Sequence, residues 1–146
     1  MKNRRDRYVV VNYNHDSDHF KDTLNKGTIG IPDRKHTSGR RILDKASSKE
    51  PIYGVLYDAR SRNVRGFFTT LGDAYHSSKD QKMFKGANVE NNWGHRIKAM
   101  VYISPKNVIP ANDFKAMGGK LRKGSMTVIP EKTWIKVKQQ LTSPEA

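Results

Sequence analysis

The chain has 146 residues, within the usual size of one domain, so we expect residues 1–146 to form a single fold. Lysine and arginine number 28 against 14 aspartates and glutamates. The resulting formal charge of +14 favours a polyanionic partner, with nucleic acid ahead of an anionic membrane or an acidic protein. The sequence holds no cysteine, which excludes disulfides, thiolate zinc sites and cysteine nucleophiles.

Membrane and export signals are also missing from the sequence. No apolar run approaches the roughly 18 residues that span a bilayer. The stretch "MKNRRDRYVVVNY" has basic residues but no apolar segment long enough for a signal peptide. We therefore expect a cytoplasmic protein with no membrane partner.

The first half of the chain predicts a buried strand, a short helix and a basic loop. "RYVVVNY" (7–13) is rich in β-branched and aromatic residues, which is typical of a strand inside a sheet. "HDSDHFKDTLNKG" (15–27) predicts a short helix with a polar cap and a closing glycine, and "TIGIP" (28–32) predicts a turn out of it. Residues 33–50 hold six lysines or arginines and one apolar pair, and we interpret them as an exposed basic loop.

The middle of the chain predicts a hairpin followed by a long loop. "PIYGVLYDARSRNVRGFFTTL" (51–71) contains two strand patterns joined by a polar turn at 59–63, with "IYGVLY" as the more buried arm. Residues 72–92 show no sustained period, so we expect a long loop there. Loops of that length are often functional or disordered.

The last third predicts a half-buried strand and two helices. "HRIKAMVYI" (95–103) alternates, with an inward face that extends back to His95 and Trp93 and an outward face shared by Arg96 and Lys98. A short helix is expected near 111–117. A final helix at 130–141 is expected to dock through Trp134.

The order of these elements does not alternate strand and helix, which argues against a doubly wound sheet. The sequence therefore predicts an α+β fold: a small curved mixed sheet or partly closed β-barrel flanked by two or three helices.

Catalytic and metal-binding motifs are weak or missing. His15 and His19 are spaced to share one helix face, but no third metal ligand accompanies them, and capping by Asp16 is the simpler account. Neither a serine-nucleophile motif nor a glycine-rich phosphate loop occurs. The sequence predicts no cofactor, no metal and no catalytic residue. A metal-free ribonuclease or toxin that uses His76 or His95 with Arg96 stays open as an alternative, and so does a basic adaptor for an acidic protein.

Several segments resemble, in order, the YTH and EVE domains of the PUA-like fold, which read single, often modified, bases. The resemblance begins with the strand "YVVVNYNHD" and the lysine-glycine turn "NKGTIGIP" after the helix. It continues through the hairpin "IYGVLYDARSRNVRGFF" and the tryptophan-bearing strand entry "NNWGHRIKAMVYI". It ends with the glycine turn, short strand and closing helix of "LRKGSMTVIPEKTWIKVKQQL".

The resemblance implies a pocket in the mouth of the barrel that accepts a flipped or unpaired base between aromatic walls. Carried over by position, the pocket residues are Asn12, Tyr13, Asn14, Ile29, Gly30 and Trp93. Asparagine side chains suit a base edge, and aromatic rings suit stacking. The residues assigned to phosphates are Arg34, Lys35, Arg40, Arg41 and Arg96.

The sequence departs from the YTH pattern at one position. Ile29 stands where YTH readers of methylated adenine carry a tryptophan, so the EVE branch fits better, and Phe84 or Tyr75 of the long loop are candidates for the other wall. We therefore predict a monomeric, non-catalytic module that inspects one modified base in DNA or RNA, alone or beside a nuclease or helicase.

Overall fold

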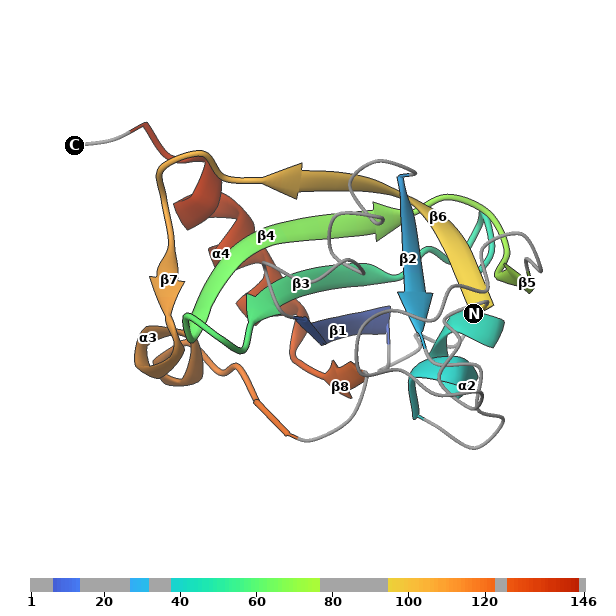
Figure 1. Ribbon diagram of the computed structural model, residues 1–146, viewed down its shortest axis with the longest axis horizontal. Helices are drawn as coiled ribbons and strands as arrows, with labels where there is room; N and C mark the ends of the chain where they lie inside the picture. The colour runs from blue at the N-terminus through green and yellow to red at the C-terminus, as the bar shows by residue number, and fades with distance from the viewer. Residues whose placement is uncertain (1–6, 14–26, 32–37, 77–94, 123–125, 145–146) are drawn as a thin grey trace.

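The structure is a computed structural model that describes residues 7–13, 27–31, 38–76, 95–122 and 126–144 (Figure 1). Its strands are β1 (Tyr8–Tyr13), β2 (Thr28–Ile31), β3 (Tyr53–Asp58), β4 (Asn63–Thr70), β5 (Tyr75–His76), β6 (His95–Ile103), β7 (Ile109–Pro110) and β8 (Met126–Val128). Its helices are α2 (Ser38–Asp44), α3 (Ala111–Ala116) and α4 (Glu131–Thr142).

The strands form one mixed, curled sheet in the order β2-β6-β4-β3-β1-β8, with β5 paired to β6 and β7 paired to β4. β1 runs parallel to β3, whereas the other pairs are antiparallel. β2 crosses one face of the sheet and α4 lies across the other (Figure 1). The predicted α+β class and the curved, half-barrel sheet are confirmed.

The centre of the sheet is buried on both faces. One apolar cluster, which we call the inner core, joins α2 and β2 to the sheet through residues such as Leu43, Ile29 and Phe68. A second cluster, the outer core, joins α3 and α4 to the opposite face through residues such as Phe114 and Trp134. β3 contributes to both cores, and nearly all of its residues are buried, whereas the residues of β4 alternate between buried and half-buried.

Helix α4 docks through Trp134, as the sequence predicts. The indole lies on the half-buried rings of β3 and β4, with centroids 5.1 Å from Tyr53 and 6.0 Å from Phe67. Its Nε1 donates a hydrogen bond of 3.1 Å to the carbonyl of Gly54. A buried indole N–H needs such a partner, so this bond fixes the position of the helix along β3.

Two segments differ from the sequence prediction. Residues 28–31 form strand β2 rather than a turn, paired with β6. The segment 33–50 is not all exposed loop, because α2 lies within it and buries Ile42 and Leu43 in the inner core, together with Ala46 just after the helix. An apolar pair followed by alanine one turn later is enough to dock a short helix, although the basic composition suggests a loop.

The remaining elements agree with the prediction within the described residues. The hairpin is β3 and β4, and α3 and α4 occupy the two expected helical positions. The exception is the segment 72–92, predicted as a long loop, in which Tyr75–His76 form the short strand β5. The helix predicted at 15–27 and residues 77–92 lie outside the described residues. Within the described part of the chain, no helix has the length and apolarity needed to cross a membrane.

A substitution at Gly54 tests the two-sided core. A Cβ atom there would lie 2.0 Å from Cε2 of Phe68, with Phe68 itself packed in the inner core. We expect Gly54→Ala to lower the free energy of unfolding by about 1–3 kcal/mol, because the ring of Phe68 has no free space to move into. Urea unfolding measures this. Thr69→Ala on the neighbouring strand should change stability far less, and equal effects of the two variants would contradict the packing argument.

Tyr8 makes stability depend on pH at the alkaline end. Its hydroxyl donates a 3.0 Å hydrogen bond to Glu131, and burial together with this carboxylate raises its pKa from 10.0 to about 12. A raised pKa means that the unfolded chain loses the proton first. The stabilising effect is therefore complete below pH 10 and is lost as the pH rises to about 12.

The check is urea unfolding across this pH range. Tyr8→Phe should be less stable than the wild type at neutral pH and should lose part of the alkaline decline. Tyr75→Phe, at an exposed tyrosine, should keep the decline of the wild type. An unchanged decline in Tyr8→Phe would show that other groups cause it.

Candidate nucleic-acid interface

The end of strand β1 lies beside the tip of the β3–β4 hairpin. In the parallel pairing, Asn12 is opposite Tyr57 and Tyr13 is opposite Asp58. Asn12 Nδ2 also donates a 2.9 Å hydrogen bond to the backbone carbonyl of Arg122. Two residues that the sequence assigns to the base pocket are therefore next to a basic turn and a basic segment before β8.

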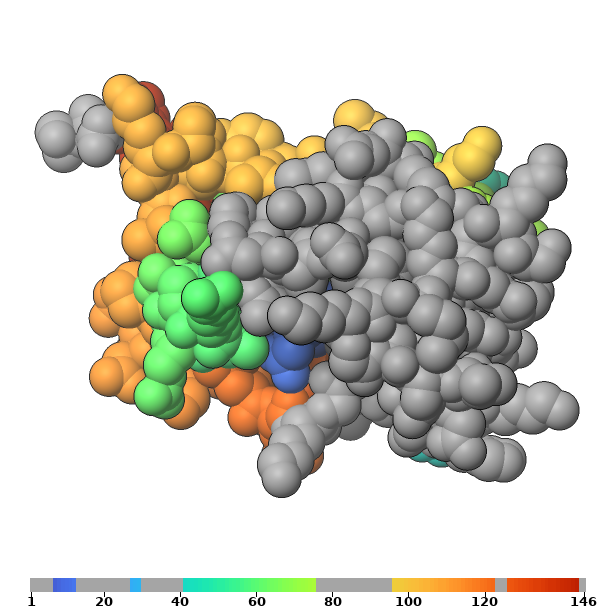
Figure 2. All heavy atoms as spheres, in the orientation of Figure 1, coloured from blue at the N-terminus to red at the C-terminus, as the bar shows by residue number. Residues whose placement is uncertain are grey.

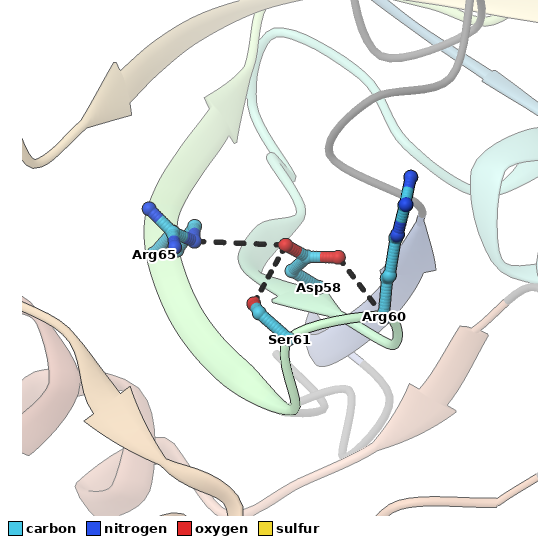
Figure 3. A network of polar contacts seen from close by, with 4 residues as sticks. All are labelled: Asp58, Arg60, Ser61 and Arg65. Atoms are coloured by element: carbon cyan, nitrogen blue, oxygen red, sulfur yellow. Dashed lines mark hydrogen bonds and ion pairs between the residues drawn. The ribbon is translucent and has the colours of Figure 1, made fainter.

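The hairpin tip is organised by the carboxylate of Asp58, which is only 1% exposed (Figure 3). It accepts hydrogen bonds from the backbone N–H of Arg60 at 3.1 Å and from Ser61 Oγ at 2.7 Å. Arg65 Nε lies 3.6 Å from Asp58 Oδ2. The pairing of β3 with β4 shifts register between Leu56 and Tyr57, which makes Arg65 the extra residue of a β-bulge.

This arrangement presents two further arginines to solvent. Arg60 and Arg62 are exposed at the tip. Arg62 has a φ of 61°, a left-handed conformation that costs a non-glycine residue about 1 kcal/mol. Its N–H donates to the Asp58 carbonyl at 2.8 Å, and its own carbonyl accepts from Ala111 at 3.0 Å. The backbone of the tip is thus held by hydrogen bonds, and the carboxylate of Asp58 is buried beneath it.

The hairpin tip is visible on the molecular surface. Figure 2 shows the turn between β3 and β4 at the surface, with atoms of β1 beside it and the chain that leads into β8 below. Arginines at such a turn can contact phosphates without reading sequence. The phosphate contacts predicted from the sequence lie elsewhere in the chain. The proximity of the hairpin to the end of β1 comes from strand pairing and has no local signal in the sequence.

A second group of predicted residues lies where β2 pairs with β6. Gly30 is opposite Arg96, and Ile29 is opposite Ile97. Ile29 is 2% exposed and belongs to the inner core. β6 and β3 both pair with β4, so the two groups can be placed along that strand. The Ile29–Gly30 group lies toward the Thr70 end of β4, and the Asn12–Tyr13 group lies toward the Asn63 end.

Arg96 does not point outward into solvent, and that prediction is wrong. The side chain is fully buried, and Nη1 donates a hydrogen bond of 3.2 Å to Thr28 Oγ1. Arg96 does share a face of β6 with exposed Lys98, as the alternation requires. Alternation identifies the face but not what covers it, so Arg96 is a structural residue here rather than a surface contact for phosphate.

The other predicted site residues are only partly described. Arg41 is exposed on α2, and Arg40 lies in the same helix. Asn14, Arg34, Lys35 and Trp93 lie outside the described residues, as does Phe84, so their assignments stay predictions. Tyr75 lies on β5 and is 36% exposed. Among the described residues, no group of three or more histidine, aspartate or glutamate side chains is placed to hold a metal ion.

Two histidines named for the ribonuclease alternative are brought together by the sheet. His76 of β5 is directly opposite His95 of β6, and the next pair along is Tyr75 with Arg96. The spacing in sequence gave no sign of this pairing.

Comparison with known proteins assigns the fold. No family model matches the chain, and no curated protein matches it. Among solved structures, the Pho92 YTH domain in complex with m6A matches with a TM-score of 0.68 and 14% identity, covering 100% of this chain and 89% of that one. The YTH domain of Zygosaccharomyces rouxii MRB1, in complex with N6-methyladenosine RNA, matches with a TM-score of 0.58 and 10% identity over 96% and 89% of the two chains.

A bacterial structure matches as well. Protein PSPTO5229 from Pseudomonas syringae has a TM-score of 0.61 and 13% identity, with 92% of this chain and 99% of that chain covered. At these identities the likeness concerns the fold. The chain has the PUA-like fold of the EVE and YTH type over nearly its whole length, which confirms the resemblance noted in the sequence.

The hairpin tip yields a stability prediction. Asp58→Asn removes the charge opposite Arg65 and replaces one buried acceptor with a donor, so we expect the free energy of unfolding to fall by about 1–3 kcal/mol. Asp73→Asn, at an exposed aspartate, should stay within about 0.5 kcal/mol of the wild type. Urea unfolding of both variants measures the difference. If Asp58→Asn matched its control, Asp58 would not organise the turn.

Proposed function

We propose that this protein binds nucleic acid and inspects a single flipped or unpaired base, modified in its natural target, in the mouth of the half-barrel. The observation that carries the proposal is the fold shared over the full chain with YTH domains crystallised with m6A or N6-methyladenosine RNA. The formal charge of +14 supports it, because phosphates supply most of the affinity in such complexes.

In this proposal the base pocket lies at the end of β1, with Asn12 and Tyr13. Trp93, from the segment before β6, has to reach it across the sheet, because the described ends of the two strands lie toward opposite ends of β4. Tyr13 and Trp93 stack on the base, and Asn12 and Asn14 bond its edge. Ile29 sits in the inner core and supports the pocket by packing. Since the tryptophan of YTH readers is replaced by Ile29, we propose that the modification is not read by a complete tryptophan cage, and we favour the EVE branch.

Phosphates are proposed to bind the exposed arginines around this pocket. The hairpin tip adds Arg60 and Arg62 to the positions inferred from the sequence. Of those positions, Arg41 is exposed, whereas Arg96 is buried and is no longer assigned to phosphate. Asp58 supports this role because it orients the turn from a buried position.

A small metal-free ribonuclease is the second candidate, and the pairing of His76 with His95 favours it. Two imidazoles on neighbouring strands are one way to supply a general acid and a general base. The binding-only function is preferred because Arg96, the predicted phosphate contact of such a site, is fully buried.

Binding to a panel of short DNA and RNA oligonucleotides with different base modifications tests the proposed function. The affinity of the wild type should fall steeply with salt and should differ between modified and plain oligonucleotides. Replacing Arg60 and Arg62 together by alanine should weaken all ligands alike and reduce the salt slope by about 0.7 for each lost contact to a single strand. Lys115→Ala, at an exposed lysine on α3, serves as the control.

Trp93→Ala should instead remove the discrimination between bases and keep the salt slope. A folded Trp93→Ala protein that still discriminates would exclude Trp93 from the pocket. The absence of any salt-dependent binding would favour the adaptor for an acidic protein. Cleavage of labelled RNA that disappears in His76→Ala or His95→Ala would establish the ribonuclease.

A further inference from the structure

Strand β6 carries two exposed apolar side chains, Met100 and Tyr102, on the face of the sheet to which α4 docks, and we call these two residues, with half-buried Phe67 of β4, the apolar ribbon. In the register, Thr69 is opposite Met100 and Phe67 is opposite Tyr102. Met100 is 68% exposed and Tyr102 37% exposed, although both lie on a central strand pair. An apolar ribbon of this kind on a strongly basic protein indicates an interaction surface.

The two aromatic rings of the ribbon are held in place by the outer core. The centroids of Phe67 and Tyr102 are 5.1 Å apart, with an interplanar angle of 34°. Phe67 meets Trp134 edge-on at 6.0 Å, with an interplanar angle of 87°. Because Trp134 is itself anchored to Gly54, the ribbon presents aromatic surface on a rigid support.

The charges along the ribbon favour an anionic ligand. Neither β4 (NVRGFFTT) nor β6 (HRIKAMVYI) contains an acidic residue. Exposed Lys98 lies two positions before Met100, and exposed Lys106 follows shortly after β6 in a cleft lined with Asn107, Gln139 and Gln140. Along β6, Lys98 and Tyr102 are separated by about 13 Å.

We propose that this ribbon is a stacking platform for unpaired bases of a single nucleic-acid strand, with Met100 and Tyr102 under the bases and Lys98 and Lys106 at phosphates. Aromatic residues on adjacent strands of an open sheet face can stack two or three bases. The inference rests on the proposed function and extends it. Ile29, which supports the proposed pocket by packing, lies in the inner core, whereas Phe67 of the platform packs with the outer core.

The test compares oligonucleotides of two lengths, each with the same modified base: one of about 4 nucleotides and one of about 16. Tyr102→Ala should weaken the longer ligand by about tenfold, the lower part of the range for loss of one base stack, and leave the shorter one unchanged. Tyr102→Phe keeps the ring and should restore the affinity of the wild type. Val128→Ala, at a 38% exposed apolar residue of β8, should bind both ligands like the wild type.

The outcomes separate the two proposals. If the wild type binds neither oligonucleotide, the proposed function fails and the platform with it. If the wild type binds both and Tyr102→Ala binds the longer one equally well, the platform alone is wrong. Equal losses for both lengths would mean that Tyr102 acts through the pocket or the fold, which also overturns it. If Tyr102→Ala lost binding to an acidic, leucine-containing peptide but bound nucleic acid like the wild type, the ribbon would be assigned to a protein partner.

Discussion

Gly54 is the point at which the two cores of this protein reach the same strand from opposite sides. On the inner face, the ring of Phe68 occupies the space that a Cβ atom would need. The carbonyl of the same residue accepts the indole N–H of Trp134 from α4. The strand can bring these two aromatic anchors so close to one residue only because that residue has no side chain.

The consequences extend from this strand to both proposed binding surfaces. Trp134 positions α4 and supports Phe67, which in turn supports Tyr102 at the surface. At the other end of β3, Asp58 continues directly from the buried run and holds the hairpin tip. One glycine-containing strand thus positions both an apolar ribbon and a basic turn.

Sequence patterns predicted the elements that bury one regular face. The alternation of β6 and the stripe of Trp134, Val137 and Leu141 on α4 are visible in the sequence because each repeats several times. Strand β2 has four residues, including Gly30, and α2 offers only a few apolar contacts, so neither repeats enough to be recognised. The resemblance to YTH and EVE domains identified the fold because it used the order of segments rather than the periodicity of any one.

The site was harder to predict because it depends on contacts between distant segments. The burial of Arg96 involves Thr28, 68 positions earlier, and no local pattern reports such a contact. The approach of the hairpin tip to the end of β1 follows from a parallel pairing whose partners are 45 residues apart, from Tyr13 to Asp58. Local signals identified which residues are basic or aromatic, but the pairing of the strands decided which of them meet.

The position of β1 has a consequence for how the chain is made. β1 pairs with β3 on one edge and with β8 on the other, and its residues Val9, Val10 and Val11 are opposite Val128, Thr127 and Met126. During synthesis, β1 leaves the ribosome long before β8 does. Until β8 is made, the edge of β1 that pairs with it has unpaired backbone amides and uncovered apolar side chains. Such an edge is a binding site for chaperones and a point of misassembly. Completion of the sheet therefore depends on a segment that is translated long after β1.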